Sequence, residues 1–209
     1  MYLSRLTLNR SRLAYSWLTN PYRIHQRLKM ACPDDPRLLY RVEAGENTRI
    51  LVQSIQPPDW DAAFGDFLVL DRPPECKEFE PCLQAGRQLR FRLVANPTAR
   101  ISAWEAEKHN GEVRKRRYAL LKGEQQMEWL ARQASRHGFR VLDASRTSAS
   151  WLQGKKTDQK GTADTIQVLA VQFDGLLVVT DPARLAEALA GGIGPAKGLG
   201  CGLLSLARA

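Results

Sequence analysis

The chain has 209 residues, enough for one large domain or two small ones with a hydrophobic core. Its formal net charge of +9 predicts a partner with many negative charges, and nucleic acid is the leading candidate. The four cysteines form no Cys-x-x-Cys pair and there are only three histidines, which argues against a zinc site. Nothing in the cysteine spacing suggests a disulfide framework, so we expect a reducing cytoplasm. No signal peptide or membrane-spanning apolar run is recognisable, so we expect a cytoplasmic protein that uses no membrane, metal or other cofactor.

The first half of the chain predicts one β-α-β-β-α-β unit, the order of a ferredoxin-like fold. Alternation of apolar and polar residues indicates the strands, and Asn20-Pro21 supplies an N-cap and a proline at the first helical position. Strands are expected at 2–8, 38–43, 49–55 and 88–94, helices at 21–31 and 59–64, and an irregular segment at 71–81.

The second half predicts a repeat of the same unit. Asn96-Pro97 ends a strand and is the expected boundary, which divides the chain into domains at 1–96 and 97–209. Asp174-Gly175 favours a hairpin turn, and Asp181 followed by Pro182 favours the start of the last helix. Strands are expected at 139–142, 165–173, 176–179 and 203–206, helices at 123–137 and after 181, and a lysine-rich excursion at 154–161. The expected fold class is α+β, with tandem ferredoxin-like domains.

Glycine occurs six times between Gly191 and Gly202, where the only charged residue is Lys197. The pattern is neither a P-loop nor a dinucleotide fingerprint, because it lacks Gly-Lys-Ser/Thr and does not follow a strand. Instead, two Gly-apolar-Gly triplets, 192–194 and 200–202, are separated by five residues. One interpretation is a helix C-cap with close strand packing; the other is a backbone that lies against a phosphate, with Gly198 and Lys197 between the triplets.

Tyr22 and His25 lie three residues apart, on one face of the first turns of a predicted helix, and Lys29 continues that face. An imidazole, a phenol and a cation near a phosphate suit RNA cleavage by the RNA's own 2′-hydroxyl, which needs two proton transfers and stabilisation of the phosphorane. By spacing alone, the pair could equally be a core or surface pair. His109, in a polar loop, and His137, at a helix end, are interpreted as solvated or capping residues.

The sequences MYLSRLTL, NPYRIHQRL, LVQSIQPPDW, LRFRLVANPTAR and GIGPAKGLGCGLLSLA together resemble the CasE family of CRISPR-RNA endoribonucleases. The resemblance implies metal-independent cleavage of precursor CRISPR RNA at the base of a repeat hairpin, which leaves a 2′,3′-cyclic phosphate and a 5′-hydroxyl. It identifies His25 and Tyr22 as catalytic. Some members carry a lysine one position beyond Lys29, where this chain has Met30, so Lys29 is the candidate third residue.

The resemblance also implies that the second domain grips the RNA hairpin and keeps it within the Cascade complex, beside the other Cascade subunits. The absence of an RNP-type aromatic strand favours a grip on duplex phosphates. A non-catalytic RNA-binding subunit with the same fold is the alternative. The candidate RNA-binding residues are Arg114, Lys115, Arg116, Arg117, Arg132, Arg136, Lys155, Lys156, Lys160 and Lys197, with the glycines Gly192, Gly194, Gly198, Gly200 and Gly202 as the loop that faces the RNA.

Overall fold

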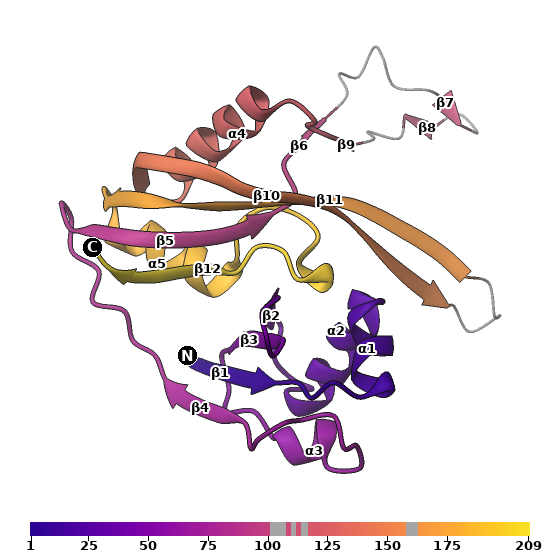
Figure 1. Cartoon of the computed structure of the whole chain (residues 1–209). Helices are drawn as coiled ribbons and strands as arrows, with labels where there is room; N and C mark the ends of the chain where they lie inside the picture. The colour runs from indigo at the N-terminus through magenta and orange to yellow at the C-terminus, as the bar shows by residue number, and fades with distance from the viewer. Residues whose placement is uncertain (101–107, 110–111, 114–116, 158–162) are drawn as a thin grey trace.

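A computed structural model describes residues 1–100, 108–109, 112–113, 117–157 and 163–209. It contains two four-stranded antiparallel sheets that lie one above the other in Figure 1. The first sheet has the order β2-β3-β1-β4 and the second the order β10-β11-β5-β12. In each sheet the first strand in sequence lies between the third and the fourth, which is the ferredoxin-like arrangement. The predicted tandem ferredoxin-like fold is therefore confirmed.

The first sheet consists of β1 (Tyr2–Thr7), β2 (Leu39–Glu43), β3 (Arg49–Ser54) and β4 (Glu75–Glu78), with helices α1 (Arg12–Leu18), α2 (Pro21–Ala31) and α3 (Trp60–Phe64). The second consists of β5 (Gln88–Ala95), β10 (Phe139–Thr157), β11 (Ala163–Val179) and β12 (Leu204–Arg208), with α4 (Gly123–Arg136), α5 (Pro182–Gly191) and the 3₁₀ turn η1 (Lys197–Leu199). Two small ladders pair β6 (Thr98–Arg100) with β9 (Arg117–Ala119), and β7 (Lys108–His109) with β8 (Glu112–Val113). Among the described residues, no helix is long and apolar enough to cross a membrane.

The change of sheet does not coincide with the predicted boundary at residues 96 and 97. β5 pairs with β11 and β12, so it opens the second sheet rather than closing the first. The fourth strand of the first sheet is β4, which lies in the segment expected to be irregular and pairs with β1. All four residues of β4 are exposed, so the segment lacks the apolar alternation that marks a strand in sequence.

Asp174-Gly175 is not a hairpin turn, because β11 runs through it without interruption. Asp174 accepts a hydrogen bond from Arg92 Nε of β5 at 2.6 Å. A Cβ on Gly175 would lie 2.1 Å from the carbonyl oxygen of Asp143, beside a register shift in β10. The glycine therefore marks a close backbone approach at a bulge. The lysine-rich segment 154–161 also begins inside a strand, because β10 continues to Thr157. The strand predicted at 139–142 is therefore only the start of β10.

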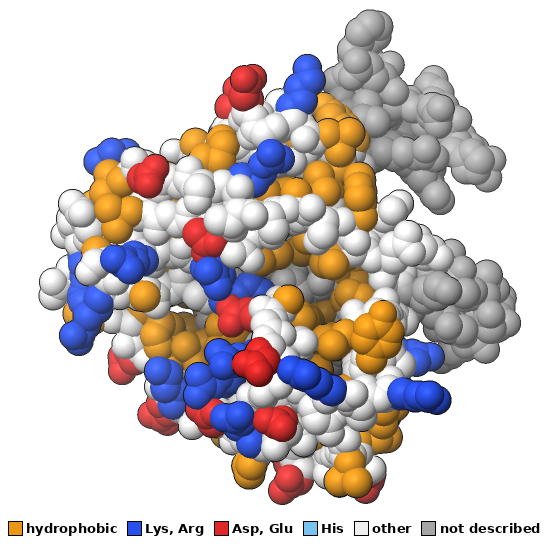
Figure 2. Space-filling view, viewed as in Figure 1, with side chains coloured by type: hydrophobic (Ala, Val, Ile, Leu, Met, Phe, Trp, Pro, Cys, Tyr) orange, Lys and Arg blue, Asp and Glu red, His pale blue; other side chains and the backbone are white. Residues whose placement is uncertain are grey.

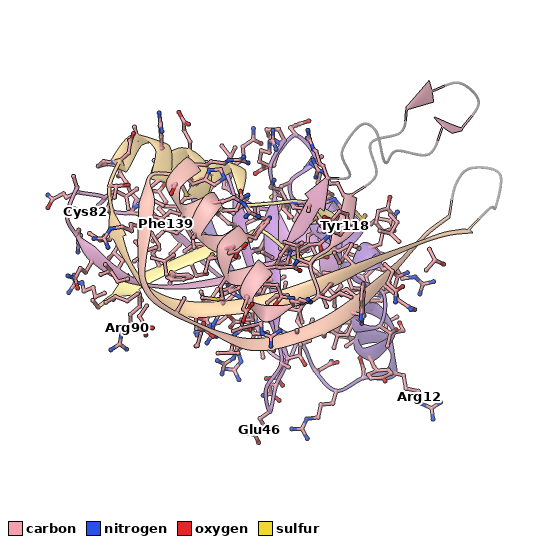
Figure 3. The ribbon with its side chains drawn as sticks, turned by 90° about the horizontal axis from the view of Figure 1, so that it is seen from above. Arg12, Glu46, Cys82, Arg90, Tyr118 and Phe139 are labelled. Atoms are coloured by element: carbon pink, nitrogen blue, oxygen red, sulfur yellow. The ribbon has the colours of Figure 1, made fainter. Side chains whose placement is uncertain are left out.

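Each sheet buries one face under its own helices. In the second domain, Phe91 and Leu93 of β5 pack with Trp129 and Leu130 of α4 and with residues of α5. Seen from above in Figure 3, α4 lies across the long curved strands, with Phe139 at the start of β10. In the first domain, α2 and the short helices cover the inner face of the first sheet. α1 was not predicted; Ser11 caps it by accepting a hydrogen bond from the Ala14 amide.

The outer face of the first sheet packs against the second domain through buried polar groups. Gln53 Nε2 donates to the Leu189 carbonyl of α5 at 2.6 Å. Arg41, also buried, donates to Ser205 Oγ of β12 at 3.0 Å and pairs with Glu43 at 2.6 Å. These bonds satisfy groups that would be costly to bury alone, and they fix how the two domains meet. The outer surface is different: basic and acidic side chains are intermixed on the face of the first domain in Figure 2.

Candidate active site

His25 lies in α2, half-buried between the two domains. Its ring is nearly parallel to that of Tyr40 in β2, with centroids 6.2 Å apart, and the Tyr22 ring lies 6.4 Å away at a tilt of 43°. From the second domain, η1 packs against α2: a Cβ on Gly198 would lie 3.5 Å from His25 Cδ2. The glycine segment and the predicted catalytic helix thus form one site, built from both domains.

Burial is the main cause that lowers the pKa of His25, and the nearby charge of Lys29 lowers it further. Within the described part of the chain, His25 Nδ1 is buried without a hydrogen-bond partner. An imidazolium would have to leave an N–H unbonded there, which disfavours the charged form. The neutral imidazole therefore predominates at neutral pH.

The glycine pattern has a conformational cause. All four glycines of the two triplets have positive φ, between 71° and 95°. The residues between them, Ile193 and Cys201, are both fully buried, and the Ile193 amide donates to the Gly202 carbonyl at 2.9 Å. Each triplet therefore sends one apolar side chain into the core and turns the backbone on both sides of it. Gly198 has an ordinary φ, and its small size lets the backbone approach His25.

Lys29 and Lys197 are both held by backbone carbonyls. Lys29 Nζ donates to the Asp35 carbonyl in the loop after α2. Lys197 Nζ donates to the Gly194 carbonyl at 2.9 Å, and burial, followed by the charge of Arg37, lowers its pKa. Met30, the residue after Lys29, is exposed.

A basic pocket of about 620 Å³ is lined in part by Gly194, Pro195 and Lys197 of the glycine segment. Two of its cations, Arg132 and Arg136, come from α4, and Lys197 comes from η1. Arg100 of β6 and Arg117 of β9 complete the five; Tyr118, next to Arg117, is labelled in Figure 3. No Asp or Glu lines the pocket among the residues that the structure describes. Such a site suits phosphate groups.

The structure thus brings four of the predicted RNA-binding residues together: Arg117, Arg132, Arg136 and Lys197. Lys155 and Lys156 lie near the far end of β10, and that strand passes the site, because a Cβ on Gly154 would lie 3.5 Å from Tyr22 Cβ and 2.6 Å from Leu199 Cδ2. Arg114, Lys115, Arg116 and Lys160 lie outside the described residues. His137 caps the end of α4 as expected.

Sequence reasoning missed Arg100 and Tyr40. Arg100 follows the end of β5 and has no pattern around it. Tyr40 takes an ordinary core position in the alternation of Leu38, Tyr40 and Val42, so its contact with His25 carries no sequence signal. Among the described residues, no three His, Cys, Asp or Glu side chains are grouped so that they could hold a metal ion.

Residues 1–208 match the family model of the CRISPR associated proteins. The chain is 36% identical to the CRISPR-associated endoribonuclease Cse3 of Thermus thermophilus, over 99% of this chain and 100% of the relative. It is 32% identical to the Cascade subunit CasE of Escherichia coli, over 99% of each chain.

Solved structures give the same result. A structure of Cse3 bound to a 19-nucleotide RNA matches the whole of both chains with a TM-score of 0.84 and 36% identity. The crystal structure of Cas6e from Escherichia coli also matches both chains completely, with a TM-score of 0.74 and 32% identity. With the family model and two full-length relatives in agreement, this chain belongs to the CRISPR-associated protein family that includes Cse3 and CasE.

Proposed function

We propose that this protein is an endoribonuclease that cleaves precursor CRISPR RNA at the base of the repeat hairpin, without a metal ion. The observation that carries the proposal is the place of His25: a largely neutral imidazole between α2 and Gly198, beside a basic pocket. The relatives named as CRISPR endoribonucleases, one of them solved with RNA, support the same substrate class.

The reaction is an internal transesterification. The 2′-oxygen attacks the adjacent phosphorus as its proton passes to His25, and the bond from phosphorus to the 5′-oxygen breaks. The imidazolium returns that proton to the departing 5′-oxygen, which leaves a 2′,3′-cyclic phosphate and a 5′-hydroxyl. A neutral imidazole is the form that accepts the first proton. We assign to the Tyr22 hydroxyl, whose ring lies 6.4 Å from that of His25, the role of hydrogen-bonding the phosphate during the step.

The basic pocket grips the substrate. Its five cations lie on α4, β6, β9 and η1, so a strand that passes His25 continues over Lys197 toward Arg132 and Arg136. We infer that Lys155 and Lys156, near the end of β10, also contact the RNA. We infer that the protein holds its product hairpin and joins the other subunits of a Cascade complex, and that it acts in the cytoplasm, where its RNA substrate is made.

The test is cleavage of a cognate repeat hairpin in the presence of EDTA. We expect the wild-type protein to cut once and leave a cyclic phosphate, and a single 2′-deoxy substitution before the scissile phosphate to block cutting. His25→Ala should abolish cutting while its RNA affinity stays within about twofold of wild type, since catalysis and phosphate binding use different groups.

The control variant is His137→Ala, which removes a histidine at the end of α4 and should cut at the wild-type rate. Full activity in His25→Ala, or cutting of the 2′-deoxy RNA, would contradict internal attack assisted by His25. Tight binding without any cutting by the wild type would identify the alternative, a non-catalytic RNA-binding subunit.

A further inference from the structure

Tyr40 is fully buried in the edge strand of the first sheet, but its hydroxyl points to the boundary between the domains. It donates to the Pro21 carbonyl at 2.7 Å, and the Gly198 carbonyl lies 3.2 Å from the same oxygen. Pro21 begins the helix that carries His25, one turn before it, and Gly198 is the residue that packs against the imidazole. The Tyr40 hydroxyl thus contacts both α2 and η1, the two elements that meet at His25.

The bond is a permanent one. Burial raises the pKa of Tyr40 far above its ordinary value, so the phenol keeps its proton and remains a donor throughout the working pH range. Both acceptors are backbone carbonyls, which do not titrate. Loss of the hydroxyl would remove the donor shared by the buried bond to Pro21 and the partly buried contact with Gly198, a change that favours separation of η1 from α2.

The ring of Tyr40 restricts His25 as well. The two rings are within 18° of parallel. Gly200 also approaches the Tyr40 ring: it has a φ of 86°, and a Cβ there would lie 3.2 Å from Tyr40 Cε2. The second Gly-apolar-Gly triplet therefore leaves room for the ring that supports His25. The tyrosine is held in place by the same segment that it binds.

We propose that Tyr40 is the positioning residue of this active site: its hydroxyl joins α2 to η1 and its ring fixes the plane of the His25 imidazole. Tyr40 is fully buried and does not reach the RNA, so it acts only through His25 and Gly198. The proposal rests on the proposed catalytic role of His25. It goes beyond that role, because it explains how a histidine on one domain is held against the backbone of the other.

Among the described side chains, the charged and titratable groups around His25 come from α2, η1 and β2. Lys29 lies on its own helix, Lys197 precedes Gly198 in η1, and Tyr22 and Tyr40 supply the two phenols. Burial outweighs the charge of Lys29 as the cause of the lowered pKa. If η1 moves away in Tyr40→Phe, solvent reaches the imidazole and the pKa of His25 rises toward its ordinary value.

The experiment compares Tyr40→Phe with wild type. The variant keeps the ring, so it is expected to fold. Single-turnover cleavage should be at least about tenfold slower while RNA affinity stays within about twofold, because misplacement of a catalytic group acts on the chemical step. NMR titration of the His25 imidazole without RNA should show a raised pKa, and the acid limb of the pH profile of kcat/KM, which reports the free enzyme, should move to higher pH by the same amount.

The matched control is Gln53→Leu, which removes a different side-chain bond between the domains, to the Leu189 carbonyl. It should leave the pKa of His25 and the pH–rate profile unchanged. An equal pKa in Tyr40→Phe and wild type, or an equal shift in Gln53→Leu, would overturn the proposal. If the wild type cuts no repeat RNA, the proposed function fails, and the NMR comparison still decides whether Tyr40 positions His25.

Discussion

At the scale of single residues, the environment of His25 decides its chemistry. A histidine three residues after a tyrosine is compatible with a solvated surface pair, in which the imidazole would titrate near 6.5. Here the ring lies between Tyr40 and the backbone of Gly198, and Nδ1 is buried. The sequence identifies the residue type and its position in the helix; only the fold removes water from one side of the ring.

His25 and His137 should also make stability depend on pH. Burial, more than neighbouring charges, lowers the pKa of both in the folded protein. Their contribution is fully present above about pH 6.5, where both are neutral in either state, and is lost as the pH falls from 6.5 through the folded-state pKa. Urea unfolding between pH 5 and 7.5 should show a free energy of unfolding that falls toward acid.

The double variant His25→Asn/His137→Asn should lose part of that pH dependence, because these groups no longer bind protons on unfolding. The comparison of slopes cancels the titration of carboxylates, which both proteins share. An identical slope in the variant and the wild type would show that neither histidine resists protonation in the folded state.

At the scale of elements, glycine positions carry two different meanings. In the segment 192–202 they allow positive φ, so their spacing is visible in the sequence as a motif. In β11, Gly175 has no unusual φ but lies against the backbone of β10. The dipeptide Asp174-Gly175 has the composition of a turn, and only the strand pairing shows that the glycine is required for close approach.

Gly175→Ala should therefore destabilise the protein by at least about 2 kcal/mol, since the new methyl group would overlap the Asp143 carbonyl and the strands would have to shift. Gly191→Ala is the matched control: it is the last residue of α5, and no atom outside its own helix and chain neighbours lies within 4 Å of the new Cβ, so a gain of at most about 0.5–1 kcal/mol is expected. Chemical denaturation measures both. Equal stabilities of the two variants would refute the close approach.

At the scale of the whole molecule, the candidate active site is formed where the two domains meet. α2 supplies His25 and Tyr22, and the backbone of Gly198 comes from the segment that links α5 to β12. The basic pocket draws its cations from four elements of the second domain. The fold thus gathers five of the chain's basic residues in one pocket. Part of the net charge of +9 is therefore available to bind phosphate groups near the imidazole.

RNA affinity should fall steeply with salt, because each phosphate contact releases counterions. In a plot of log K against log salt concentration, Arg132→Gln/Arg136→Gln should reduce the slope by about two. The control is Arg12→Gln/Arg90→Gln, which removes two exposed charges outside the pocket; both arginines point outward in Figure 3. That variant should keep the wild-type slope. Equal slopes in the two double variants would show that the pocket does not hold the RNA backbone.

The ferredoxin-like repeat, the glycine segment and the residues of α2 can be predicted from the sequence, because they depend on local alternation, capping and φ preferences. It could not determine that β5 belongs to the second sheet or that β4 is a strand, since pairing partners lie far away along the chain and the exposed β4 has no apolar face. The same holds for Tyr40 and Arg100: the one has the pattern of a core residue, the other no pattern. Only tertiary packing brings Tyr40 and Arg100 to the candidate site, because contacts between segments far apart in the chain depend on how the two domains dock.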